Sequence, residues 1–199
     1  MKTPFLITIA ATAGFAVANP ISLDDATRVT QTNAGTPNVT YTVDISGYQF
    51  NDSQGSLNNE TLSILFGNNQ LITGIGWDVN LSTIGASWAS EATMFFHTDF
   101  NPSSDFNLNV ADDSAPVSNQ QYQSDILDLT DSGLSNIGFG PGLWELEIEF
   151  FESFIDNAGT GDAFFEQGSV LRLAVFEMPA PGPLSVLGLG GLFAARRRR

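Results

Sequence analysis

The chain has 199 residues and no cysteine, so it is long enough for one domain with a sizeable core, and disulfides, thiolate metal sites and cysteine nucleophiles are excluded. The formal net charge is −15, although five of the seven basic residues are Lys2 and the terminal run Arg196–Arg199. Without those five positive charges the intervening segment carries −20, a charge that phosphate backbones repel, so we expect no nucleic-acid partner.

The first eighteen residues have the three parts of a secretory signal peptide. Lys2 supplies a positive charge, residues 5–17 are mostly apolar, and Ala16 and Ala18 form an A-x-A cleavage site. The apolar stretch is shorter than the roughly twenty residues that span a bilayer. We therefore predict a signal helix within residues 1–18 and cleavage after Ala18.

Residues 19–177 form short apolar–polar runs separated by turns rich in Gly, Asn, Asp and Ser. Residues 19–38 are polar, and we interpret them as a loose lead-in or an edge strand. Period-two alternation then predicts eight strands; these are residues 39–45, 62–66, 75–81, 92–96, 106–110, 126–129, 144–150 and 170–176. Residues 112–124 lack any pattern, which predicts a long exposed loop. Such a series of strands predicts an all-β fold, an antiparallel β-sandwich of jelly-roll type.

Little in this segment points to catalysis. Its one histidine, His97, ends an aromatic strand, and no G-x-S-x-G motif accompanies it as a hydrolase triad would require. Glu145, Glu147 and Glu149 share one face of the clearest strand at steps of about 7 Å, and we interpret them as a solvated face. We predict that the protein is not an enzyme. The alternative that stays open is a hydrolase with two carboxylates, because the chain has 22 acidic residues.

A glycine-containing loop is the best candidate for a metal site. Asp156, Asn157 and Asp162 lie around Gly159 and Gly161, and oxygen ligands of this kind suit calcium rather than zinc. Their spacing departs from the EF-hand pattern, and a hairpin turn accounts for the same residues. We therefore predict no cofactor, with calcium at this loop as the one candidate.

The aromatic side chains divide into core and surface candidates. Trp77 and Trp144 alternate in phase with aliphatic residues, so we expect them in the core. Trp88 and Tyr122 are flanked by small or polar residues, so we expect them at the surface. Flat aromatic rings at a surface are the groups with which non-catalytic modules bind polysaccharide.

The last segment, residues 178–199, joins a proline-rich box to an apolar run and four arginines. Pro179, Pro181 and Gly182 lie in the box, and no charge occurs over residues 178–195. Such a length is at the lower limit for a membrane-spanning helix. The arginines that follow predict a cytoplasmic end by the positive-inside rule; they are Arg196, Arg197, Arg198 and Arg199.

This three-part ending resembles the PEP-CTERM sorting signal, which is also catalogued under an ice-binding-protein C-terminal label. The resemblance covers residues 178–199, with Ala180 where the family often has glutamate. It implies that an exosortase, a membrane-embedded transpeptidase, recognises the Pro-x-Pro box and releases or transfers the protein at the envelope. Such proteins are typical of Gram-negative bacteria that make extracellular polysaccharide. An ice-binding surface would need a flat array of repeated threonines, and the sequence has no such repeat.

Together these features predict an exported protein that is held transiently in the inner membrane by its C-terminal helix. After sorting we expect it in the cell envelope, at the outer surface or in the extracellular matrix. The domain over residues 19–177 is then expected to be a non-catalytic adhesion or polysaccharide-associated module, with exopolysaccharide as the candidate partner. The alternative is a secreted hydrolase that uses carboxylates to act on polysaccharide.

Overall fold

The computed structural model describes residues 20–23, 25, 27–33, 38–67, 69–155 and 161–177, and these form an all-β fold as predicted. The signal peptide, Asp156 and Asn157 of the candidate calcium loop, and the whole C-terminal segment 178–199 lie outside the described residues. Within the described ranges, no helix is long and apolar enough to cross a membrane.

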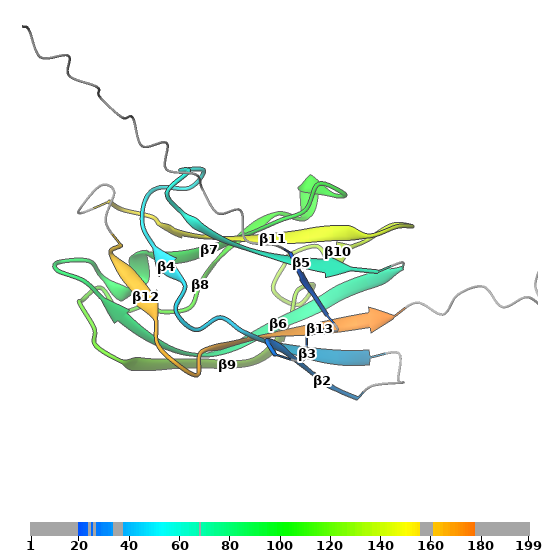
Figure 1. Ribbon diagram of the computed structural model, residues 1–199, viewed down its shortest axis with the longest axis horizontal. Coiled ribbons are helices and arrows are strands. Elements are labelled where there is room, and N and C mark those ends of the chain that lie inside the picture. The colour runs from blue at the N-terminus through cyan, green and yellow to red at the C-terminus, as the bar shows by residue number, and fades with distance from the viewer. Residues whose placement is uncertain are drawn as a thin grey trace, which may run out of the picture.

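Two sheets face each other across a common core (Figure 1). The five-stranded sheet has the order β1-β5-β11-β7-β8; its strands are β1 (Ile21–Ser22), β5 (Glu60–Phe66), β11 (Trp144–Glu152), β7 (Ala92–His97) and β8 (Phe106–Asn109). Among the described strands only β1 and β5 pair in parallel, and every other pairing is antiparallel. This arrangement is consistent with the predicted β-sandwich.

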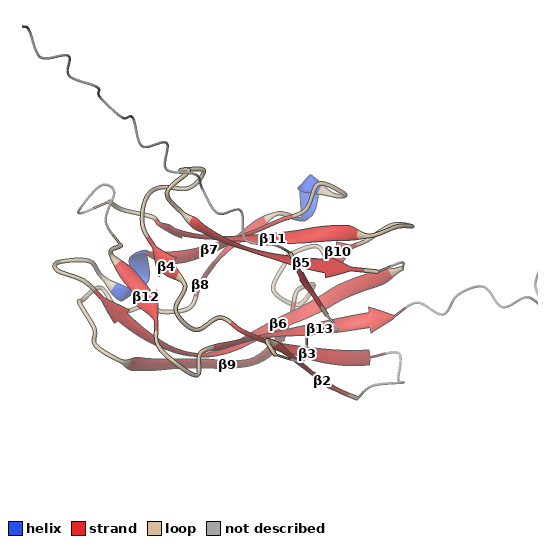
Figure 2. Cartoon of the chain, viewed as in Figure 1, coloured by secondary structure: helices blue, strands red, loops and turns tan. Residues whose placement is uncertain are grey.

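The eight-stranded sheet is built around its longest strand, β6 (Gln70–Thr83). The main path is β2-β3-β13-β6-β12-β4, and β9 and β10 also pair with β6. The other strands are β2 (Val29–Thr32), β3 (Asn38–Asp44), β4 (Gln49–Phe50), β9 (Gln120–Asp128), β10 (Ile137–Gly138), β12 (Ala163–Phe165) and β13 (Val170–Glu177). Two short 3-10 helices, η1 (Ala89–Glu91) and η2 (Pro102–Ser104), lie at opposite ends of the molecule (Figure 2).

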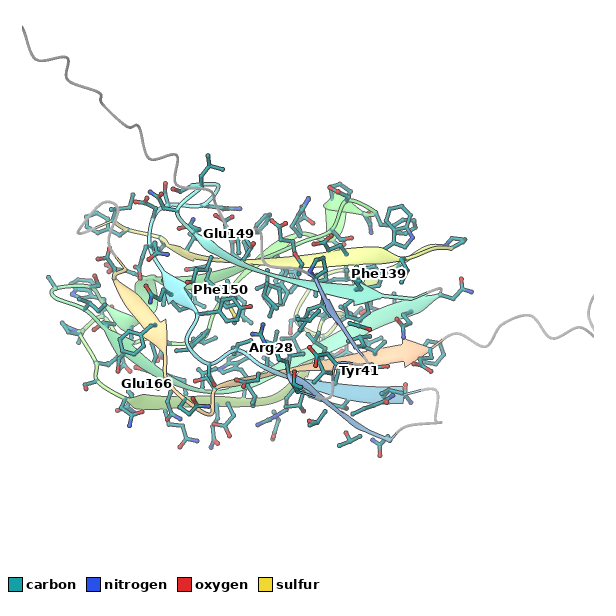
Figure 3. All side chains as sticks on the ribbon, in the orientation of Figure 1. Arg28, Tyr41, Phe139, Glu149, Phe150 and Glu166 are labelled. Atoms are coloured by element: carbon teal, nitrogen blue, oxygen red, sulfur yellow. The ribbon has the colours of Figure 1, made fainter. Side chains whose placement is uncertain are left out.

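Period-two alternation places one side of each strand in the core, because successive side chains of a strand point to opposite faces. In β11, Leu146, Ile148 and Phe150 are fully buried, while Glu145 and Glu147 reach solvent. Figure 3 shows Phe150 directed into the space between the two sheets. The predicted apolar face of residues 144–150 is therefore the core face of β11.

The predicted loop over residues 112–124 is wrong in its second half. There β9 begins at Gln120 and pairs with β6 as far as Asp128. Most of its side chains are exposed, so no apolar alternation marks residues 120–125, although the predicted strand 126–129 overlaps the last three residues of β9. Backbone pairing with β6, rather than burial of one face, makes this segment a strand.

Two glycines of β6 allow β9 to approach it closely at a bulge in their pairing. The pairing between the two strands contains a bulge opposite Gly76, where a Cβ would lie 3.0 Å from backbone atoms of Asp125. A Cβ on Gly74 would lie 2.7 Å from Ile126 Cγ2. Larger residues would force the strands apart, so the glycines bring Ile126 onto the outer face of the sheet.

Candidate functional site

The outer face of the five-stranded sheet brings ionisable and aromatic side chains together. Strand register places His97 of β7 beside Glu147 of β11, and Phe95 beside Glu149. Directly opposed side chains on one face lie about 5 Å apart, so these groups form one continuous surface. We call this surface, which also includes Glu145, the β11 face.

His97 lies between two aspartates that follow β7 in the chain. Its Nδ1 is 2.8 Å from Asp105 Oδ2, and its Nε2 is 3.2 Å from Asp99 Oδ1. Phe95 stacks on the imidazole with 5.9 Å between ring centroids. The hydrogen bond with Asp105 outweighs burial and raises the pKa of His97. A carboxylate at each ring nitrogen favours the protonated imidazolium, in which both nitrogens donate.

We expect His97 to titrate above its ordinary value of 6.5. Because the native pKa is raised, its stabilising contribution is fully present below pH 6.5 and is lost as the pH rises through the native pKa. Asp105→Asn should lower the midpoint more than Asp99→Asn, since Asp105 is the larger cause. Nitrogen-15 NMR of the imidazole measures the titration midpoint of His97 in the parent chain and in the two variants. A midpoint at or below 6.5, or a reversed order of the two variants, would contradict the assignment.

The three glutamates of β11 have different environments. Glu145 and Glu147 reach solvent, whereas Glu149 is only 9% exposed. Glu149 Oε1 accepts hydrogen bonds from the Gly55 N–H at 2.7 Å and from Asn59 Nδ2 at 2.6 Å. The interpretation of all three as solvated is therefore wrong for Glu149, because the loop between β4 and β5 covers it. Burial raises the pKa of Glu147, an effect that the nearby charge of His97 opposes.

Beyond Glu149 the same sheet carries a pocket of about 350 Å³. Its lining includes the amide side chains of Gln54, Asn107 and Asn109, together with the buried residues Thr93, Phe151 and Glu152. Amides both donate and accept hydrogen bonds, whereas Phe151 is only 5% exposed and offers little apolar surface. This combination suits a ligand that carries many hydroxyl groups.

At the end of the sheet near η2, Phe100 and Trp144 form an aromatic pair with 4.7 Å between ring centroids. Trp144 Nε1 donates to the carbonyl oxygen of Pro141 at 3.3 Å, which fixes the indole. Phe100 is 41% exposed and Leu143 is 74% exposed. Phe100 also packs over Gly140, where a Cβ would overlap its ring. The result is a rigid apolar surface that faces solvent.

The four aromatic predictions have different outcomes. Trp77 is buried as predicted, at 9% exposure, and Trp88 is at the surface as predicted, at 45%. Trp144 packs against the core but is only partly buried. Tyr122 is not a free surface ring, because it packs against the core and its hydroxyl donates to Asp113 at 2.6 Å. Burial raises the pKa of Tyr122.

Asp162 is the described member of the candidate calcium loop, and its side chain is fully buried. Its N–H donates to the Phe50 carbonyl oxygen at 2.8 Å, and its own carbonyl oxygen accepts from the Ile84 N–H at 2.7 Å. Among the residues that the structure describes, no group of three or more His, Asp or Glu side chains could hold a metal ion. Calcium at Asp156, Asn157 and Asp162 therefore stays a prediction.

Sheet register also gathers threonines that do not repeat in the sequence. Thr30 faces Thr42, and Thr32 faces Thr40, across the paired strands β2 and β3. The four lie on the outer side of the larger sheet, opposite the buried valines of β3. Antiparallel pairing, which the sequence does not display, brings them together.

No family model matches the chain, and no curated protein matches it. Among solved structures, an IBDV viral particle has a TM-score of 0.36 at 14% identity, over 74% of this chain and 37% of that chain. The infectious bursal disease virus Gx strain has a TM-score of 0.30 at 13% identity, over 77% of this chain and 47% of that chain. The chain thus corresponds to less than half of either viral chain, and a likeness this low carries no argument about function.

Proposed function

We propose that the protein is an exported, non-catalytic module of the cell surface that contacts polysaccharide at the end of its five-stranded sheet near η2. In this proposal the scaffold is a jelly-roll-like β-sandwich. The observation that carries the proposal is the pair of the exposed Phe100 and the partly buried Trp144, with the exposed Asp99 next to Phe100 in sequence.

A sugar ring presents apolar C–H groups on its faces and hydroxyl groups around its edge. Aromatic rings cover the faces, and carboxylates and amides hydrogen-bond the hydroxyls. The chain offers Phe100 and Trp144 for the first contact and the exposed carboxylate of Asp99 for the second, whereas Glu145 points to the opposite face of β11. The amide-lined pocket beside Phe151 lies at the other end of β11 and is a separate polar surface of the same sheet.

The proposed location rests on the sequence. A signal peptide cleaved after Ala18 would start export, and the segment 178–199 would anchor the chain and present its Pro-x-Pro box to an exosortase. Fractionation of producing cells tests this placement, with the protein expected in the envelope and Asn19 as its first residue. An intact full-length chain in the cytosol would contradict it.

The polysaccharide contact is tested by retention of the full-length protein on immobilised exopolysaccharide. Phe100→Ala should reduce retention about fivefold to tenfold, because loss of one aromatic contact costs about 1 kcal/mol. Trp88→Ala is the matched control, since Trp88 is as exposed but lies beside η1 at the other end of the molecule. Equal retention of the two variants would contradict the proposal.

The second candidate is a carboxylate-dependent hydrolase, and one observation favours it. The raised pKa of Glu147 is the property of a general acid, and Glu145 and Glu149 flank it along the strand. The same retention assay separates the two functions when the supernatant is analysed for released sugar. Binding without release supports the first function, whereas release that Glu147→Gln abolishes would establish the second.

A further inference from the structure

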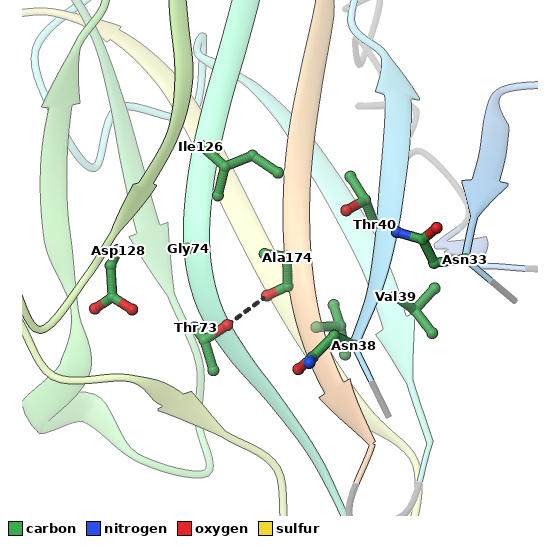
Figure 4. A pocket seen from close by; sticks show the side chains of 10 residues that line it. Asn33, Asn38, Val39, Thr40, Thr73, Gly74, Ile126, Asp128 and Ala174 are labelled. Atoms are coloured by element: carbon green, nitrogen blue, oxygen red, sulfur yellow. Dashed lines mark hydrogen bonds between the residues drawn. The ribbon is translucent and has the colours of Figure 1, made fainter. Parts of the chain in front are cut away.

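The larger sheet carries a cavity on its outer face, on the side of the molecule away from the β11 face. Its volume is about 290 Å³, and it lies across β3, β13, β6 and β9 (Figure 4). Ala174 of β13 stands opposite Gly74 of β6 and Thr40 of β3 in the strand register. Because the first two residues are so small, the sheet surface is hollow at this point.

The bulged strand β9 supplies one wall of the hollow. Ile126 is 38% exposed, and it reaches across Gly74 toward β13 (Figure 4). The bulge that carries Ile126 is possible only because Gly74 and Gly76 have no side chains. The wall is therefore an apolar side chain held in a fixed place beside a floor of Ala174 and Gly74.

The remaining lining consists of Val39 and Val175, whose side chains are buried, and of hydrogen-bonding groups without a positive charge. These groups are two amides, two hydroxyls and one carboxylate, from Asn33, Asn38, Thr40, Thr73 and Asp128. The Thr73 hydroxyl donates to the Ala174 carbonyl oxygen at 3.4 Å, which orients its lone pairs as acceptors. Groups that donate and accept hydrogen bonds beside an apolar wall match the edge and the face of a sugar.

Asp128 is fixed in place and stays ionised. Its Oδ1 accepts hydrogen bonds from the Thr130 hydroxyl at 2.5 Å, from the Thr130 N–H at 2.8 Å and from the Asp131 N–H at 3.2 Å. The Thr130 hydroxyl is the main cause of a lowered pKa of Asp128. The bonds given by the described residues engage only this oxygen, and Oδ2 is the oxygen that a ligand hydroxyl can reach.

Charge then selects the class of ligand. The segment 19–177 carries −20 and has two basic side chains. Arg28 donates to the Asp44 carbonyl oxygen at 3.2 Å, and Arg172, one pleat from Ala174 on the same side of β13, lies 3.6 Å from Asp78 and donates to the Ser124 carbonyl oxygen at 3.4 Å. A uronate or sulfated sugar would meet this field and Asp128, and the one cation near the cavity is already paired with a carboxylate. We infer that the cavity binds an uncharged sugar unit of a neutral polysaccharide. This second site stands on the cavity alone and extends the proposed polysaccharide contact to the opposite face.

The test is calorimetric titration of the full-length chain with neutral hexasaccharides (cello-, malto- and laminarihexaose) and with hexagalacturonate, in a detergent without a sugar headgroup. At least one neutral hexasaccharide should bind, and the uronate should not. Ala174→Leu fills the hollow and should weaken binding at least about tenfold. Val170→Leu makes the same kind of enlargement on the same side of β13 but outside the cavity, so it should bind like the parent chain.

A second pair of variants checks the polar contacts. Thr40→Val should weaken binding about threefold to tenfold, and Thr42→Val, which lies one pleat further along β3 outside the cavity, should leave it unchanged. Phe100→Ala separates this inference from the proposed function, because it lies on the other sheet. If Phe100→Ala abolishes binding of the neutral hexasaccharide and Ala174→Leu leaves it intact, the inference is overturned and the first site is supported. Binding of no neutral sugar, or preference for the uronate, would also overturn it.

Discussion

Phe150→Ala should lower the free energy of unfolding by about 3–5 kcal/mol, the largest effect that we expect of a single substitution. Phe150 is fully buried between the sheets. Its ring stacks on Tyr48 with 4.4 Å between centroids and meets Phe50 and Phe165 edge-on at 5.7 and 6.1 Å. The variant leaves a cavity that these rings cannot fill, since each is held by its own strand or loop.

Phe150→Ala also removes the ring that supports Tyr48, the partner of the Arg28 guanidinium. Tyr48, on which Phe150 stacks, accepts a hydrogen bond from Arg28 at 3.2 Å and lies 5.4 Å below its guanidinium. A shift of Tyr48 would weaken both contacts, which adds to the cost of the cavity.

Urea denaturation of the full-length chain measures the loss. Phe154→Ala is the control, because Phe154 lies just after β11 and is 63% exposed, so its removal should cost less than about 0.5 kcal/mol. Similar losses for the two phenylalanine variants would show that the rings around Phe150 are not the centre of the core.

Glu149→Ala should cost about 1.5–3 kcal/mol, because two hydrogen bonds to a charged acceptor are lost. The Gly55 N–H and Asn59 Nδ2 would be left without the carboxylate that they now contact. Figure 3 shows Glu149 on the outer side of the five-stranded sheet, where the loop over residues 51–59 reaches it. The loop should therefore open locally as the fold weakens.

Two measurements test this assignment. Hydrogen exchange of the Gly55 amide should quicken in Glu149→Ala, in parallel with the loss of stability in urea. Glu145→Ala is the control on the same strand, and its effect should stay below about 0.5 kcal/mol because the side chain reaches solvent. If the two glutamate variants lose equal stability, or if Gly55 exchange does not change, the contact between Glu149 and the loop does not stabilise the protein.

The sequence by itself determined the all-β class and most of the strands. The alternation over residues 144–150 identified β11 and its core face, because a strand that buries one side must repeat every second residue. The sequence identified only the end of β9, where the predicted strand 126–129 overlaps it, because residues 120–125 are mostly exposed and form a strand through their pairing with β6. The export and sorting signals belong to residues 1–18 and 178–199, and they stay predictions from the sequence.

Only the tertiary structure decided which side chains meet. Glu149 and Asn59 are 90 positions apart, and Phe100 reaches Trp144 from a different strand connection. The cavity over Ala174 draws its lining from β3, β6, β9 and β13. Periodicity fixes the face of a strand on which a residue lies, because that depends on the local backbone. The neighbour across the sheet depends on strand order and register, and these follow from the packing of the whole chain.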